Sequence, residues 1–301
     1  MRILVTGSSG WLGRTLVPRL ADLGHDVFGL DPAPAPTTHL VGSVVDRERV
    51  RAAIADFGIE AIVHSGALHK PHIATHRRED FIAVNVNGTF NLLEEAAIQG
   101  VRRFIFTSTT SLMINREIRA GGAARAVWLT EELAPAPRNI YGVTKLAGEH
   151  LCRLYHEELG LAVIVLRTAR FFPEADDMAH AIAQSDANTK ANEMLSRRLT
   201  VADAAESHVV ALEKVEEIGF DTFIISAKPP FSPDDCEALV RDAPAVVAHY
   251  FPDYPEIYGR LGWTMFDRID RIYDPARAAT RLGFTCRTDF RRVLDDLRES
   301  A

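Results

Sequence analysis

The sequence predicts an α/β protein with a doubly wound, mostly parallel β-sheet and a smaller C-terminal α/β lobe. Two observations predict this fold. Over the first 170 residues, short apolar runs alternate with helical patterns at intervals of roughly 30 residues, as in sheets covered by helices on both faces. The first run, residues 2–6, passes into glycines at three-residue intervals and then into a helical pattern.

Composition predicts a soluble chain of one large or two fused domains. Of 301 residues, 47% are hydrophobic and 25% are charged. The net charge of −7, without a long basic block, argues against nucleic acid as a partner. No apolar run approaches the roughly 18 residues that span a bilayer, so no membrane partner is expected. Without a signal-peptide pattern or a CxxC among its three cysteines, the chain is expected in the reducing cytoplasm.

The glycine turn after the first run predicts a nucleotide site. Such a turn leaves backbone N–H groups and the positive end of a helix facing outward, where a pyrophosphate can bind. Its glycines allow an unusual backbone angle, close approach of the phosphate and packing of the helix on the strand. Alone the turn is a weak signal, because purely structural turns share its spacing. The expected contacts are Gly7, Ser9, Gly10, Trp11, Leu12 and Gly13.

The second predicted strand, residues 25–30, is closed by an acidic residue. Asp31 lies about 20 positions beyond the glycine turn, where a Rossmann fold binds the adenosine ribose hydroxyls. A proline follows it instead of an arginine, so no neighbour in the sequence favours a 2′-phosphate. The sequence therefore predicts NAD as the cofactor rather than NADP.

Two further strands, residues 61–64 and 103–106, end in small or hydroxyl side chains. Residues 65–67 follow the first and allow a cofactor to approach the backbone. The second runs into Thr107–Ser111, and because ligands of open α/β sheets bind at the carboxyl ends of strands, chemistry is expected there. A long helix is predicted between them, over residues 77–99.

Three histidines follow the strand at residues 61–64. His69, His72 and His76 are spaced as metal ligands can be, but no carboxylate or cysteine set completes a site, and no metal is expected. Two interpretations stay open: surface histidines, or loop histidines beside a substrate pocket.

A Tyr-x-x-x-Lys pair opens the helix predicted from Asn139 to Leu159. Tyr141 and Lys145 are one turn apart and share a face of that helix. An ammonium beside a phenol favours the phenolate and lowers a pKa that is about 10 when unperturbed. Such a phenolate can take a proton from an alcohol and return it later. The pair is common by chance, and it gains meaning by following a nucleotide turn and a hydroxyl-rich strand end.

Together these residues resemble the extended short-chain dehydrogenase/reductase superfamily, specifically its NAD-dependent epimerase/dehydratase branch of nucleotide-sugar enzymes. The resemblance runs from Met1 to about Gly283 and is strongest over the first 170 residues. It implies a Rossmann-type domain over residues 1–170, to which residues 199–228 contribute later strands. Residues 171–301 would form mainly a substrate-binding lobe.

The resemblance also implies a role for each matching residue. Thr109, Tyr141 and Lys145 take the catalytic positions, with Thr109 binding the substrate oxygen and Lys145 the nicotinamide ribose. The expected cofactor contacts are Gly7, Ser9, Gly10, Trp11, Leu12, Gly13, Asp31, Val44, Ser65, Gly66, Ala67, Asn85, Thr107, Tyr141 and Lys145. The expected substrate contacts are His69, Arg167, Arg170, Arg197 and Arg271.

Three departures from the family pattern leave the substrate open. Ser43 replaces the aspartate of the adenine site, so contact there depends on the backbone and Val44. Arg170 takes the place of an asparagine that touches the diphosphate in relatives, although an arginine can bind phosphate or carboxylate. The acidic segment 174–177 follows and fits poorly beside a diphosphate.

The resemblance implies an enzyme that oxidises its substrate transiently with bound NAD, first of all a nucleotide-sugar 4-epimerase. Thr110 and Ser111 stand where dehydratases carry Asp-Glu, which argues against dehydration. The alternatives are an NAD-dependent dehydrogenase or reductase of a small alcohol or ketone, and a non-catalytic NAD sensor. A homodimer is expected through the helices that carry Asn85 and Tyr141.

Overall fold

The computed structural model describes residues 1–120, 123–171 and 184–299. Its main sheet has seven strands in the order β3-β2-β1-β4-β5-β7-β8, and every neighbouring pair is parallel. The strands are β1 (Arg2–Thr6), β2 (Asp26–Asp31), β3 (Leu40–Val41), β4 (Ala61–His64), β5 (Arg103–Thr109), β7 (Ala162–Thr168) and β8 (Phe220–Ile225). The strand order reverses between β1 and β4, which confirms the predicted doubly wound sheet.

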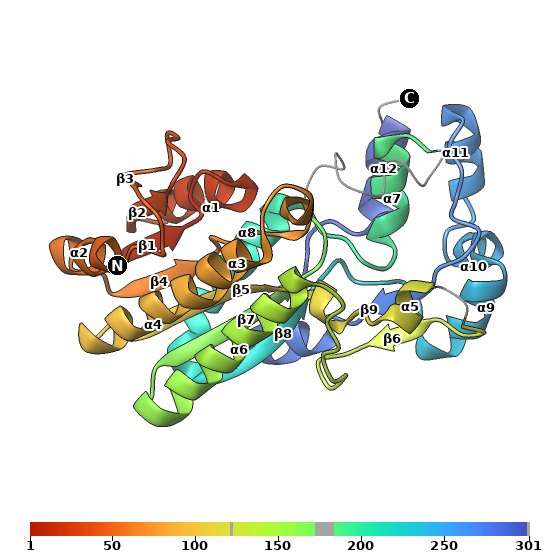
Figure 1. The fold of residues 1–301 in the computed structure, drawn as a ribbon. Helices are drawn as coiled ribbons and strands as arrows, with labels where there is room; N and C mark the ends of the chain where they lie inside the picture. Colours follow the sequence, from red (N-terminus) through yellow and green to blue (C-terminus); the bar gives the residue numbers. More distant parts are fainter. Residues whose placement is uncertain (121–122, 172–183, 300–301) are drawn as a thin grey trace.

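Helices cover both faces of this sheet (Figure 1). In β1, Ile3 and Val5 belong to a core shared with α1 (Trp11–Asp22) and α8 (Val201–Ile218). Leu4 points to the other face, because successive side chains of a strand alternate. There it joins the core under three helices, α2 (Arg47–Phe57), α4 (Gly88–Ile98) and α6 (Ile140–Leu159).

The helix predicted over residues 77–99 forms in three parts. α3 (Arg78–Phe81) leads into a π-helical segment, Ile82–Asn87, and then into α4. A π-turn widens the helix locally and is often found at functional sites. Here it contains Asn85, whose side-chain amide bonds to the loop after β4.

The second lobe is mostly helical and lies beyond the carboxyl ends of the main strands (Figure 1). A short parallel pair, β6 (Val127–Leu129) and β9 (Arg271–Tyr273), joins it to the first half of the chain. β6 lies before residue 170, where the sequence analysis places the boundary between the two parts. The remaining helices are α5 (Arg116–Ala120), α7 (Asp186–Met194), α9 (Cys236–Arg241), α10 (Ala243–Tyr250), α11 (Tyr254–Leu261) and α12 (Phe290–Glu299).

Across the described parts of the chain, every helix is too short or too polar to cross a bilayer. The acidic segment 174–177, which the sequence analysis set against a diphosphate, lies outside the described residues.

Candidate active site

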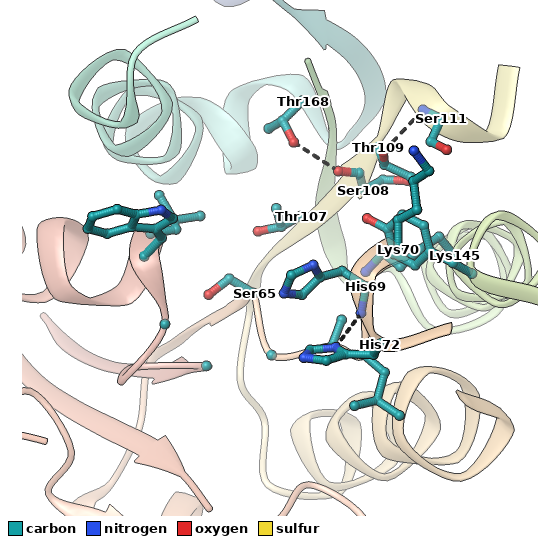
Figure 2. Close-up of a pocket in the computed structure, with 18 of the residues that line it drawn as sticks. Ser65, His69, Lys70, His72, Thr107, Ser108, Thr109, Ser111, Lys145 and Thr168 are labelled. Atoms are coloured by element: carbon teal, nitrogen blue, oxygen red, sulfur yellow. Dashed lines mark hydrogen bonds between the residues drawn. The ribbon is translucent and has the colours of Figure 1, made fainter. Parts of the chain in front are cut away.

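A cavity of 810 Å³ opens where the main strands end, as predicted for an open parallel sheet. The ends of β1, β2, β4, β5 and β7 all contribute to its wall. It brings together the following predicted residues: Gly7, Ser9, Gly10, Trp11, Leu12, Asp31, Val44, Ser65, Gly66, Ala67, His69, Thr107, Thr109, Tyr141, Lys145, Arg170, Arg197 and Arg271. Figure 2 shows the hydroxyls of β5 beside Lys145 and the loop of His69.

The glycine turn fits a pyrophosphate. Gly7 has φ +72°, and a Cβ there would lie 2.7 Å from the backbone of Gly66. A Cβ on Gly13 would lie 2.3 Å from the Gly7 carbonyl oxygen, so Gly13 packs α1 on the turn rather than lining the cavity. Gly10 offers no side chain to cap α1, and this leaves the first N–H groups of the helix for an anion.

Asp31 is held beside this turn. Its carboxylate accepts the backbone N–H of Ala33 at 2.8 Å and of Ser9 at 3.2 Å. Each carboxylate oxygen has a second lone pair, so the group can also accept from a ribose diol in the cavity that it lines.

We expect NAD to bind roughly tenfold or more tightly than NADP, because a 2′-phosphate would meet the charge of Asp31. The Asp31→Asn variant should narrow this preference by removing the repulsion. Calorimetry of both cofactors with both proteins checks this. An unchanged preference in the variant would remove the role given to Asp31.

The three predicted catalytic side chains face the same cavity. The Thr109 hydroxyl accepts the N–H of Ser111 at 3.1 Å, and hydrogen-bonds the phenol of Tyr141. Asn139 fixes the start of α6 by accepting the N–H of Gly142 at 2.9 Å. Tyr141 and Lys145 follow on the inner face of this helix, and both are buried.

The sequence predicts a lowered pKa for Tyr141, and this prediction is wrong for the protein without its cofactor. Burial raises the pKa of Tyr141 to about 12, and the hydrogen bond from Thr109 only partly opposes this. Lys145 is not among the groups that lower it, and its ammonium lies over the ring of Phe106, 3.9 Å from the ring centre. Burial also lowers the pKa of Lys145 to about 8.

Two predicted contact residues lie behind the cavity wall instead of in it. Arg167 is buried in an ion pair, with its Nη2 2.8 Å from Oε2 of Glu149. Asn85 donates to the carbonyl of Leu68 at 2.8 Å and to the Thr144 hydroxyl at 3.0 Å. Both side chains therefore support the cavity wall. Arg167 links β7 to α6, and Asn85 links the loop after β4 to α6.

Arginines form the wall on the side of the second lobe. Glu193, which the sequence analysis missed, accepts from Arg170 and from Arg197, each at 3.0 Å. Its signal was the four-residue spacing to Arg197, although Arg197 itself lies in the turn that follows α7. Burial and the nearby charge of Arg271 lower the pKa of Arg197. Arg271 donates from Nη1 to the carboxylate of Asp270 at 2.8 Å, and its buried Nε has no hydrogen-bond partner among the described residues.

The sequence analysis missed Lys70, and Figure 2 shows it on the same side of the cavity as Lys145. His72 also lines the cavity and accepts the N–H of His69 at 3.0 Å, whereas His76 is exposed outside it. The described part of the chain gathers no group of three or more metal-binding side chains. The interpretation as pocket histidines therefore applies to His69 and His72.

His208 supports the wall from behind and has no motif that could reveal it. Its Nδ1–H donates to the carbonyl of Ala204 at 2.7 Å, which leaves Nε2 to accept from the Thr107 hydroxyl at 2.8 Å. This neutral imidazole on α8 orients a hydroxyl that faces the cavity.

Burial lowers the pKa of His208 from 6.5 to about 4, so between these values the unfolded chain binds a proton that the folded chain does not. Stability from this group is complete above pH 6.5 and is lost as the pH falls towards 4. We expect it to account for roughly 2 kcal/mol of the unfolding free energy lost between about pH 7.5 and about pH 4.5. Urea unfolding of His208→Gln should show a correspondingly smaller loss; equal losses in both proteins would contradict this.

Comparison with known proteins agrees with this geometry. The model of the NAD dependent epimerase/dehydratase family matches residues 3–225. The UDP-glucose 4-epimerase of Corynebacterium glutamicum is 24% identical over 331 residues, covering 98% of this chain and 94% of that one. A 3-beta-hydroxysteroid dehydrogenase of Mycolicibacterium neoaurum is 29% identical over 185 residues, 58% of this chain. This match spans about half (49%) of that relative.

A solved structure shares the whole fold. It is a short-chain dehydrogenase/reductase superfamily protein from Agrobacterium tumefaciens with bound NAD, with a TM-score of 0.70, 26% identity and coverage of 100% of this chain and 98% of that one. The family model covers most of this chain, including the turn, β5 and α6. The chain therefore belongs to the NAD-dependent epimerase/dehydratase family of the extended short-chain dehydrogenase/reductase superfamily.

Proposed function

We propose that this protein is an enzyme that moves a hydride between NAD and a secondary alcohol of its substrate, and that it is first of all a nucleotide-sugar 4-epimerase. One observation carries the proposal. The same cavity is lined by Thr109, Tyr141 and Lys145 and by the glycine turn. One substrate alcohol could therefore lose its hydroxyl proton to a side chain and the hydride of the same carbon to a dinucleotide.

The side chains divide the work. Tyr141 takes the proton of the substrate hydroxyl and returns it, Thr109 binds the same oxygen, and Lys145 binds the nicotinamide ribose. NAD supplies the redox chemistry by accepting a hydride and giving it back. Because burial raises the pKa of Tyr141 to about 12, the phenolate needs nearby positive charge, such as that of an oxidised nicotinamide ring.

The arginine wall supports an anionic substrate. Arg197 and Arg271 both line the cavity, and Arg271 lies close enough to lower the pKa of Arg197. A diphosphate brings two charges and several acceptor oxygens to such a wall. This favours a nucleotide sugar, the kind of substrate named for the Corynebacterium glutamicum relative.

A dehydrogenase of a small alcohol is the second candidate, and the size of the cavity favours it. At 810 Å³ the cavity lies within the range of roughly 300–1,000 Å³ that commonly holds one ligand, yet it must hold a dinucleotide and a substrate. The Mycolicibacterium neoaurum relative is itself named a dehydrogenase.

Turnover assays separate the candidates. The purified protein is first screened by thermal shift with NAD and a panel of nucleotide sugars, sugar acids and small alcohols, since a true ligand stabilises the fold by mass action. Stabilising compounds are then assayed by product chromatography and by NADH absorbance. An epimerase converts its sugar without net NADH, whereas a dehydrogenase accumulates NADH with product. NAD binding without any turnover would leave a sensor and overturn the enzymatic proposal.

The homodimer and the cytoplasmic location stay predictions. The outer faces of α4 and α6 expose Phe90 at 38% and Leu154 at 43%, and Leu146 is half-buried beside them. Apolar side chains exposed on two adjacent helices suit a helical interface between two copies.

A further inference from the structure

We propose that the ring of Phe106 is a positioning element for Lys145, a buried cation–π seat that holds the ammonium at the cavity and in its charged form. The inference rests on the proposed function only in giving Lys145 the task of binding NAD.

The ammonium of Lys145 and the ring of Phe106 are in close contact and shielded from solvent. Nζ of Lys145 lies 3.9 Å from the centre of the Phe106 ring, well inside the roughly 6 Å over which a cation is attracted to a ring face. Phe106 is fully buried and Lys145 nearly so. Attraction between a cation and a ring is strongest when both are removed from water.

Gly148 makes the seat possible. It lies one turn after Lys145 on α6, and a Cβ there would come 2.5 Å from Cζ of Phe106. The helix therefore carries no side chain where the ring must fit. The imidazole of His64 also packs on the ring, with the two ring centres 5.6 Å apart.

The ring of Phe106 is in direct contact with the ammonium, whereas the charged side chains around Lys145 act on it without an ion pair. Glu149 on α6 favours the ammonium, but its carboxylate is already bound by Arg167 and Ser108. Burial raises the pKa of the Cys152 thiol on the same helix, so this group stays neutral. Tyr141 lies one turn earlier on the helix. No carboxylate of the described chain forms an ion pair with Lys145.

His64 on β4 adds no positive charge. Its ring nitrogens bond the hydroxyls of Thr6 at 2.7 Å and Thr89 at 3.0 Å. Burial and Lys145 together hold the pKa of His64 well below its ordinary value, so this imidazole is neutral.

The consequence is a lysine that titrates close to neutral pH. Burial lowers the pKa of Lys145 to about 8, so a contact that favours the ammonium decides how much of the enzyme carries it at working pH. Removing the ring should move the Lys145 titration midpoint down by about one pH unit.

The test is a titration of Lys145 in the full-length protein. The chain has five lysines, so protein labelled with ¹³C at the lysine Cε gives few signals, and Lys145→Arg assigns the one of interest. We expect Phe106→Leu to lower its midpoint by about one unit, and to start the alkaline loss of NAD affinity correspondingly earlier. Phe104→Leu is the matched control, because Phe104 is equally buried in the same strand and core cluster.

A second variant covers the case that Phe106→Leu does not fold. Tyrosine is unsuitable at this position, because Cζ faces Gly148. Incorporation of 3,5-difluorophenylalanine keeps the shape and weakens the negative ring face, so the midpoint should fall by a smaller amount. An unchanged or raised midpoint, or an equal fall in Phe104→Leu, would overturn the inference. Failure of the wild type to bind NAD would overturn the proposed function and leave the titration result standing.

Discussion

The Tyr141→Phe variant should lose turnover by about 10²–10⁴-fold and retain NAD affinity within a few-fold. The phenylalanine ring fills the same buried space, so the fold and the cofactor cradle are kept. What is lost is the phenol oxygen that hydrogen-bonds Thr109 and that we propose exchanges a proton with the substrate hydroxyl. The measurement is kcat with the substrate found by the panel, together with calorimetry of NAD.

Tyr155→Phe is the matched control. Tyr155 lies on the same helix and is equally buried, but its hydroxyl bonds Glu94 and it lies outside the cavity lining. We expect its turnover to be unchanged. A Tyr141→Phe enzyme that works at full rate would show that another group moves the proton, and the assignment of Tyr141 would fall.

The strands that carry the cofactor site were predictable because they are buried on both faces. β1 and β4 form over the residues expected, since a central parallel strand is a continuous apolar run bounded by turn residues. β5 is longer than predicted. Thr107–Thr109 resemble turn residues, yet they pair with Leu166–Thr168 of β7.

The second lobe was less predictable, because its pairing is non-local. β6 has only three residues, and its partner β9 lies more than a hundred residues further along the chain. Neither segment alternates long enough to show a period, so no local signal links them. Without its partner the segment Val127–Leu129 looks like part of a loop.

The residue positions of the site were predictable from spacing, but its electrostatics were not. Spacing places Tyr141 and Lys145 on one face, yet only burial shows that the pKa of the phenol rises to about 12. Arg167 lies next to the last residue of β7, and only the packed structure shows that it is ion-paired with Glu149. Sequence motifs identify the residues that line a cavity, whereas burial and contacts between distant elements determine the pKa values of their side chains.

The largest effect on cofactor binding is expected from Gly7→Ala. Gly7 has φ +72°, where a side chain costs about 1–2 kcal/mol, and its Cβ would meet the Gly66 backbone at 2.7 Å. Gly66 lines the cavity, so relief of the clash must displace the cradle itself. We expect NAD affinity to fall about 100-fold or more, and the unfolding free energy to fall by about 3 kcal/mol, measured by calorimetry and urea unfolding.

Gly24→Ala separates the two causes of that loss. Gly24 has φ +82°, but a Cβ there meets nothing within 4 Å. The unfolding free energy of this variant should therefore fall only by the cost of the backbone conformation, about 1–2 kcal/mol. Its affinity for NAD should equal that of the wild type. If Gly7→Ala matches Gly24→Ala in both measurements, the clash is absorbed without moving the cavity wall, and the turn is not what holds the pyrophosphate.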